Sequence, residues 1–565
     1  MQQFWSTLNK VLKAYSLEEK VLSLICVILL IFFTFRGVNY LLSPESAFAQ
    51  NGVYTEGLLA NKPVLVNPLY VDFSQANRDV ATLVFSGLLK YDPKIKGFVD
   101  DLASLKISED KKEYDFVLKD GVKWQDGVPL TADDIIFTFG IIQNPEFQNP
   151  LLKADFEGVQ VVKVDDKTVK FLLDRPNSFF ITNLNVGILP QHILSKVAVA
   201  DLISNSFNLQ PIGSGPYKVA EQVLSTNDGK QKIILTKFDG YFGTKPKINQ
   251  IRLNVYPDEA SLLHDKASLD IVPRIVGTLN QLVYDSRFKT QSYTLPQYTA
   301  IFFNTNSAKL KSTKVRVALL KLVNKDDLIK QLDNKIRVDT PLMELNQQDW
   351  LNTADLSQAN GSLFDAGYKF KKDDKGNILP GEIYRKDSAG KDFELNLVAR
   401  QYDDGSAQQE ETVKTVNFLV EAWKKGGIKI NVQYLDDATF STAIREKTYD
   451  MIFTGQSMGY NLDTFPFWHS SQAKQDGLNL SNYKSFGADA QIESIRSTFD
   501  KDDKETRQKK LADIISKEVP ALFLYRPSYV FLTDGKVKNI SLDGLDYESD
   551  RFVNVADWCI GDECS

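Results

Sequence analysis

The 565-residue sequence contains few of the residues that bind metals or build covalent frameworks. Its three cysteines exclude a disulfide scaffold and a zinc ribbon. Its three histidines, His192, His264 and His469, lie far apart in the chain, so we expect no histidine-rich metal site and no cofactor. The net charge of −6 lacks the basic excess that neutralises phosphates, so a nucleic-acid partner is not expected.

The remaining composition is that of a large globular protein. The chain is 43% hydrophobic and 25% charged, with 35 Phe and 22 Tyr residues. A chain of this length exceeds what one hydrophobic core usually holds, so we expect two or more domains. No fixed-period repeat and no low-complexity linker divides it. These features are typical of an acidic binding protein or an enzyme.

The N-terminus contains the one long apolar stretch. Residues 21–42 are long enough, as a helix, to cross the roughly 30 Å hydrocarbon core of a membrane, and the lysines before them favour a cytoplasmic N-terminus. An A-x-A pattern ending at Ala49 is typical of a signal-peptide cleavage site. Residues 1–50 are therefore predicted to be a cytoplasmic tail with a retained membrane anchor, or a signal segment cleaved after Ala49 to release a secreted protein. Both interpretations place residues 51–565 outside the cytoplasm; a buried core helix is the remaining alternative.

This location bears on the two cysteines that end the chain. Outside the cytosol a disulfide between Cys559 and Cys564 is favoured, although the short ring would stabilise the fold little. Two free thiols and a weak metal site remain alternatives.

The rest of the chain alternates between strand and helix patterns, which predicts a mixed α/β fold. Alternating or β-branched runs predict strands at residues 113–118, 167–172, 232–237, 251–255, 301–304, 394–398, 429–434 and 450–454. Capping residues and helical spacing predict helices after Thr131 and at residues 315–322, 412–425 and 507–517.

Two glycine motifs are similar to patterns found in catalytic or phosphate-binding sites. Gly455-Gln456-Ser457-Met458-Gly459 matches the G-x-S-x-G pattern of a serine nucleophile. That pattern requires a helix to follow, but loop-forming residues follow here, and His469 is too close to Ser457 in the sequence to be the usual catalytic histidine. A turn is therefore favoured, and a surface serine hydrolase using Ser457 remains a remote alternative. Gly213-Ser214-Gly215 lacks the lysine of a phosphate loop; we expect a turn that needs permissive backbone angles.

Nine segments, in order, resemble one protein family over most of the chain. The strongest, YDFVLKDGVKWQDGVPLTADDIIFTF (114–139), joins a strand, a turn and a helix. The other eight are YTEGLLANKPVLVNPLY (54–70), LVFSGLLKYD (83–92), IGSGPYKV (212–219), FDGYFGTKPKINQIRL (238–253), AIFFNTNSAKLKSTKVRVAL (300–319), GSLFDAGYK (361–369), YDMIFTGQSMGYNLDTFPFWHSS (449–471) and EVPALFLYRPSYVF (518–531). The chain is thus similar to the family 5 extracytoplasmic solute-binding proteins of ABC importers, a group that binds peptides, nickel or oligosaccharides.

The resemblance implies a two-lobe fold of the periplasmic-binding-protein type (class II) with an extra inserted subdomain. Lobe I would comprise residues 51–91, 186–298 and 526–565, with the inserted subdomain at 92–185. Lobe II would comprise residues 299–525, and the hinge crossings would lie near residues 298 and 525.

The resemblance also implies a function without catalysis. The chain would be the extracytoplasmic substrate-binding component of an ABC importer, a monomer that captures peptides in the cleft between the lobes by hinge closure. It would deliver them to a permease and its ATPase subunits. An oligosaccharide or a metal chelate is the alternative ligand on the same fold.

Most of the implied ligand contacts lie in one loop. Gly455 and Ser457 would offer backbone groups to an extended ligand. The relatives' D-P-D-P stretch reads Asn461-Leu462-Asp463-Thr464 here, so Asn461 replaces the first aspartate. Asp463 would then hold the ligand's α-ammonium group, unless it merely caps the loop. The other implied contacts are Phe73 and Ser74 to the ligand backbone, and Tyr460 and Trp468 lining the cleft.

Overall fold

The computed structural model describes residue 16 and residues 52–71, 74–224, 228–275, 285–402 and 406–564. The predicted membrane segment at 21–42, the candidate cleavage site after Ala49 and the predicted contact Phe73 lie outside the described residues. Within the described part of the chain, no helix combines the length and the apolar character needed to span a bilayer.

A mixed sheet of 12 strands forms the centre of the molecule, and its main order is β16-β15-β17-β13-β18-β11-β1-β10-β9-β8. The strands β12 and β14 also pair with β18. Their bounds are β1 (Val53–Leu59), β8 (Tyr217–Leu224), β9 (Gln231–Lys237), β10 (Gln250–Tyr256), β11 (Ile271–Ile275), β12 (Lys289–Thr294), β13 (Gln297–Phe303), β14 (Lys335–Arg337), β15 (Glu394–Arg400), β16 (Lys429–Leu435), β17 (Met451–Ser457) and β18 (Ala521–Thr533).

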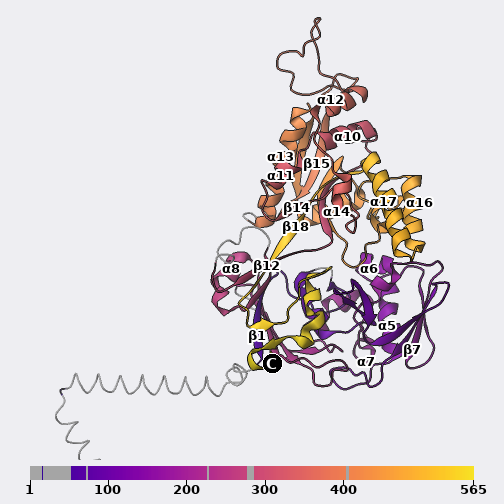
Figure 1. Ribbon diagram of the computed structural model, residues 1–565, viewed down its shortest axis with the longest axis vertical. Helices are drawn as coiled ribbons and strands as arrows, with labels where there is room; N and C mark the ends of the chain where they lie inside the picture. The colour runs from indigo at the N-terminus through magenta and orange to yellow at the C-terminus, as the bar shows by residue number, and fades with distance from the viewer. Residues whose placement is uncertain are drawn as a thin grey trace, which may run out of the picture.

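The long strand β18 runs through both parts of this sheet. Its first half pairs with β13 and β14, and its second half pairs antiparallel with β12 and β11. Figure 1 shows β18 descending from the upper part, where α10, α12, α13, α16 and α17 lie, into the lower part, where β1, coloured indigo, and the yellow C-terminal residues lie. The lower part is therefore assembled from both ends of the described chain.

Smaller sheets and helices surround the main sheet. The small sheets are β4-β5-β7-β6, β2-β3 and β19-β20, formed by β2 (Leu89–Asp92), β3 (Gly97–Asp100), β4 (Ala103–Ile107), β5 (Glu113–Leu118), β6 (Gln160–Lys163), β7 (Thr168–Leu172), β19 (Val537–Lys538) and β20 (Cys559–Ile560). The α-helices are α4 (Gln75–Val84), α5 (Ala132–Gln143), α6 (Pro150–Asp155), α7 (Gln191–Leu194), α8 (Glu259–His264), α10 (Thr313–Lys321), α11 (Lys325–Ile329), α12 (Leu356–Asp365), α13 (Ala407–Lys425), α14 (Asp437–Glu446), α15 (Phe465–Trp468), α16 (Phe486–Ser497) and α17 (Lys501–Glu518).

The buried apolar side chains form separate cores in the two parts. One cluster draws its members from residues 54–295 and 529–558. Two others draw theirs from residues 298–525, with Phe179 as the single member from elsewhere. Apart from Phe179, each part therefore buries its own apolar surface.

The strands and helices predicted from sequence patterns are present, with ends moved by a few residues. At the predicted start of α5, the Asp134 carboxylate accepts a hydrogen bond from Thr131 N at 2.9 Å. The predictions omitted β1 and β18, two strands near the middle of the sheet. Buried on both faces, β18 shows a nearly continuous apolar run instead of an alternation, and Pro527 interrupts it.

The sequence analysis predicted that Gly213 and Gly215 are needed for permissive backbone angles, and this reason was wrong. Neither residue has a positive φ angle, so no permissive backbone angle is needed. Instead, both lie against the end of α4: a Cβ on Gly213 would be 1.9 Å from the Val84 carbonyl oxygen. Gly215 N also donates to that oxygen at 2.8 Å. Glycine is needed here because two backbone segments approach closely.

Replacing Gly213 with alanine should therefore lower the free energy of unfolding by about 1–3 kcal/mol, the cost of overpacking a filled interior. Gly361→Ala is the matched control, since nothing lies within 4 Å of an added Cβ at this exposed position in α12. There the change should raise stability by about 0.5–1 kcal/mol, because alanine suits a helix better than glycine. Urea denaturation measures both; equal shifts would contradict the close-approach explanation.

A buried ionic cluster of Arg551, Asp79 and Glu56 joins the C-terminal segment to the rest of the lower part. Arg551, in the 3₁₀ segment η8 (Glu548–Asp557), donates to both carboxylate oxygens of Asp79 at 2.9 and 3.0 Å. It also donates to Glu56 in β1 at 2.9 Å. All three side chains are 0% exposed. A disulfide joins Cys559 to Cys564 just beyond, with Cα atoms 5.1 Å apart.

Candidate functional site

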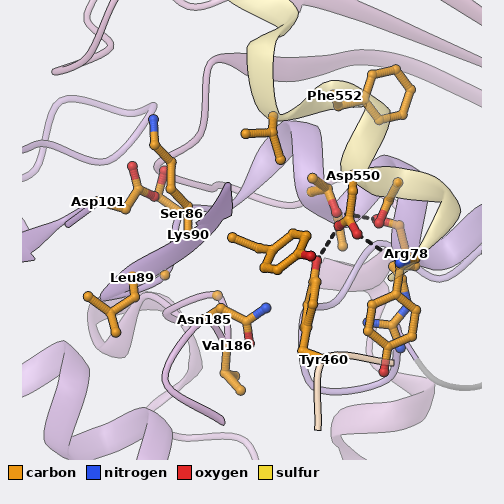
Figure 2. Close-up of a pocket in the computed structure, with 18 of the residues that line it drawn as sticks. Arg78, Ser86, Leu89, Lys90, Asp101, Asn185, Val186, Tyr460, Asp550 and Phe552 are labelled. Atoms are coloured by element: carbon orange, nitrogen blue, oxygen red, sulfur yellow. Dashed lines mark hydrogen bonds between the residues drawn. The ribbon is translucent and has the colours of Figure 1, made fainter. Parts of the chain in front are cut away.

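A cavity of about 660 Å³ lies between the two parts of the molecule. The lower part contributes residues of α4, β2, η8 and the segment 182–187, and the upper part contributes the loop that follows β17. This volume lies within the range of small-ligand sites. Figure 2 shows Tyr460 directed toward Asp550 with Arg78 nearby, while Ser86, Lys90 and Asp101 gather on another side of the pocket. The cavity is therefore polar at more than one wall.

Four of the predicted contact residues line this cavity: Ser457, Tyr460, Asn461 and Asp463. They reach it because β17 ends at Ser457 and the chain then leaves the sheet. Gly455 lies within β17, opposite Thr299 of β13, and is not among the lining residues.

Two further predicted residues lie elsewhere. The prediction that Trp468 lines the cleft was wrong: its side chain is 1% exposed and packs against Phe302 and Phe523 in a core. Ser74 is the N-cap residue of α4 and does not line the cavity. An aromatic residue in a loop sequence is as compatible with a core as with a cleft, so the pattern did not distinguish the two.

The surroundings of Ser457 do not resemble those of a serine nucleophile. Ser457 is paired in the ladder with Gln297, and a turn follows the strand where a nucleophile elbow requires a helix. The nearby His469 has its Nδ1 2.8 Å from the hydroxyl of Ser471. Within the described residues, no group of three or more His, Cys, Asp or Glu side chains could hold a metal ion.

Asn461 and Asp463 form one corner of the cavity together with groups from the lower part. The side-chain nitrogen of Asn461 donates to Asp155 at 3.3 Å and to Asn183 at 3.2 Å. Its side-chain oxygen accepts from Asp463 N at 3.1 Å. This corner, defined by Asn461, Asp463, Asp155 and Asn183, brings together residues about 300 positions apart in the chain.

Asp463 is 4% exposed and already has a cationic partner. Its Oδ2 lies 3.0 Å from Arg496 Nε, and its Oδ1 accepts from Phe465 N at 2.9 Å. Burial raises the pKa of Asp463 above its ordinary value, although the Arg496 guanidinium acts in the opposite direction. The corner therefore holds two carboxylates, of which Asp463 is paired with the Arg496 guanidinium and also interacts with the Lys504 ammonium group.

Sequence reasoning missed most of the charged groups on the other walls. Burial raises the pKa of Asp101, against the opposing effect of Lys90 and Lys119, and all three line the cavity. Asp550, from η8, accepts from Asp546 N at 2.9 Å and Tyr547 N at 2.7 Å; burial raises its pKa to about 6. No local pattern distinguishes these residues from ordinary turn and cap residues, because only the fold brings them to the cavity.

Comparisons with known proteins agree on one family. The family model of the bacterial extracellular solute-binding proteins, family 5 (middle region), matches residues 97–478. The oligopeptide-binding protein AppA of Bacillus subtilis is 28% identical over 524 residues, which cover 88% of this chain and 90% of that protein.

Two solved structures share the fold over most of their length. NikZ from Campylobacter jejuni, in complex with Ni(L-His), has a TM-score of 0.72 at 25% identity, covering 90% of this chain and 99% of that one. AppA from Bacillus subtilis, in complex with a nonapeptide, has a TM-score of 0.71 at 25% identity with the same coverage.

Proposed function

The chain belongs to family 5 of the bacterial extracellular solute-binding proteins, and we propose that it captures short peptides and delivers them to the permease of an ABC importer. It is a substrate-binding protein, not an enzyme, and it acts outside the cytoplasm. The observation that carries the peptide assignment is the cavity of about 660 Å³ between the two parts, with charged groups of both signs on its walls.

We propose the lobe boundaries that the family resemblance implied. Lobe I comprises residues 51–91, 186–298 and 526–565, with an inserted subdomain at 92–185, and lobe II comprises residues 299–525. The separate cores support this division. The change of partners along β18 near Arg526 supports a hinge there, because few strands connect the two parts. Closure of the lobes would exclude water and strengthen polar contacts to the ligand.

The corner of Asn461, Asp463, Asp155 and Asn183 is proposed to receive the amino end of the peptide. The amide nitrogen of Asn461 already donates to two converging oxygens, which is the arrangement that an ammonium group requires. A charged donor makes hydrogen bonds roughly twice as strong as a neutral one, so an ammonium group would compete well with the amide. The carboxylate at the other end of the peptide would then lie against the wall of lobe I that carries the cationic side chains of Lys90, Lys94 and Lys119. A zwitterionic peptide offers an opposite charge to both the acidic corner and the lysine wall, whereas a neutral oligosaccharide offers a charge to neither.

Ser457 and Tyr460 line the cavity together with this corner. Ser457 is proposed to offer backbone groups to an extended ligand; Gly455 does not line the cavity and is not included in this proposal. The chain would act as a monomer next to the permease and its ATPase subunits. We further propose that residues 21–42 anchor it to the membrane, the alternative being release after cleavage at Ala49.

The identity of the ligand is tested by releasing what the purified full chain carries. We expect mass spectrometry of the denatured protein to detect short peptides, and a tripeptide pool to raise the thermal midpoint. Ligand at 100 times its Kd adds about 2.7 kcal/mol of stability. Pools of oligosaccharides and the nickel–histidine chelate serve as comparisons. Stabilisation by either of these, with none by peptides, would contradict the peptide assignment.

A further inference from the structure

Tyr460 extends from lobe II into an aromatic pocket of lobe I. Its ring centroid lies 4.8 Å from that of Tyr91, 5.5 Å from Phe98 and 4.7 Å from Tyr547. Its hydroxyl donates to Asp550. The contact depends on Gly459, whose φ is +53° and where a Cβ would lie 1.9 Å from the Tyr547 hydroxyl oxygen. The residue before Tyr460 thus has to be glycine for the loop to approach this closely.

The Asp550 carboxylate that receives this hydroxyl is held firmly in lobe I. It is 3% exposed, and its other oxygen accepts the two backbone N–H groups of Asp546 and Tyr547. The Tyr547 ring, which packs against Tyr460, also contacts the Arg78 guanidinium, which lies 3.7 Å from the centroid of that ring. The receiving pocket is therefore held in place by contacts among residues of lobe I itself.

Phe179 makes the reverse contact, from lobe I into lobe II. It is 4% exposed and belongs to the core cluster that contains Tyr298 and Trp468, whereas its neighbour Phe180 belongs to the core of lobe I. The adjacent Ser178 N donates to the Arg496 carbonyl oxygen at 2.7 Å, at the end of α16. Lys504 of α17 lies 3.5 Å from the centroid of the Phe179 ring.

We infer that Tyr460 and Phe179 are reciprocal clasps, each seated in the opposite lobe, that hold the lobes closed even without ligand. Phe179 is buried and Tyr460 is half-buried, and each packs an aromatic ring, the kind of group that contributes most to an interface, against the opposite lobe. Opening the cleft must expose both rings and break the bond from Tyr460 to Asp550. The two side chains are thus positioning residues that set the fraction of closed protein and, through it, the affinity for ligand.

This inference rests on the proposed division into two lobes, and it is tested by the distance between them. Energy transfer would be measured in the full chain between dyes on Lys196→Cys in lobe I and Lys375→Cys in lobe II, both exposed, with Cys26→Ser in all samples. The variants are Tyr460→Ala, Phe179→Ala and Tyr460→Phe, which keeps the ring and removes only the hydroxyl. The control is Phe486→Ala, a phenylalanine of lobe II that is 91% exposed.

Without ligand, we expect the unsubstituted chain to be mainly closed, the two alanine variants to lose at least half of the closed population, and Tyr460→Phe to lose less. Phe486→Ala should match the unsubstituted chain. Equal closed populations in all samples, or an unsubstituted chain as open as Tyr460→Ala, would overturn the clasp. Because Tyr460→Phe preserves packing, it tests the contribution of the bond to Asp550 even if an alanine variant fails to fold, and no loss of closed protein in it would reject that contribution. If a tripeptide pool closes the lobes while the variants do not differ, the proposed function stands and only the clasp fails.

Discussion

Replacing Asp463 or Asp155 with asparagine is expected to weaken the binding of a peptide with a free amino terminus by about 30-fold to several thousand-fold. This range corresponds to the roughly 2–5 kcal/mol lost when one partner of a buried charge pair is truncated. The same peptide with an acetylated amino terminus should lose far less, because it has no ammonium group. Isothermal titration with the two forms of the peptide measures the difference.

The two substitutions act on the same corner by different routes. Asp155→Asn removes the carboxylate that now accepts from Asn461. Asp463→Asn removes the partner of Arg496, 3.0 Å away, and leaves the positive charge of that guanidinium uncompensated next to the corner. Both changes remove one of the two carboxylates of the corner, while the nearby cations Arg496 and Lys504 remain, so both disfavour a bound cation.

Asp92→Asn provides the matched control for this experiment. Asp92 also lines the cavity, but on the wall of β2, where it accepts from Lys94 N at 2.9 Å. Its replacement removes the same charge without touching the corner, and the preference for a free amino terminus should persist. Equal losses for the free and acetylated peptides in the Asp463 and Asp155 variants would reject the assignment of this corner.

Replacing Arg551 with methionine should lower the free energy of unfolding by about 3–5 kcal/mol, the cost of breaking a buried ion pair by removing one partner. Arg551 donates to Asp79 and Glu56, and none of the three side chains is exposed. Without the guanidinium, two carboxylates would remain buried and uncompensated. Urea denaturation followed by circular dichroism measures the loss.

The loss should be larger at pH 8 than at pH 5. Burial already raises the pKa of Glu56, and it raises that of the neighbouring Glu548 to about 7. Removing Arg551 takes away an effect that lowers both pKa values, so the folded variant binds more protons than the unfolded chain in this pH range. Its stability relative to the unsubstituted protein therefore rises as the pH falls.

Arg400→Met tests whether this effect comes from burial. Arg400 Nε lies 2.6 Å from Asp437, but the two side chains are 41% and 60% exposed. An exposed pair of this kind contributes about 0–1 kcal/mol, so the variant should lose little stability at either pH. If both arginine variants lost the same amount, burial of the cluster would not explain the effect.

The sequence predicted the local elements and the loop at the site well. Alternating runs located strands such as 113–118, and the resemblance located the loop from Ser457 to Asp463, which lines the cavity. These features depend on residues close together in the chain. The opposite wall was missed, because Asp155 and Asp550 look like ordinary helix-end and capping residues in their own segments.

The sequence by itself therefore determined the fold class, the family and the loop that lines the cavity, since periodicity, turn residues and motif order are properties of neighbouring residues. Only the tertiary structure decided that Arg496 pairs with Asp463, that Trp468 lies in a core, and that Tyr460 and Phe179 each pack against the opposite part of the molecule. Each of these contacts joins segments that are separated by tens to hundreds of residues. Their geometry is set by the packing of segments far apart in the chain, which no local pattern records.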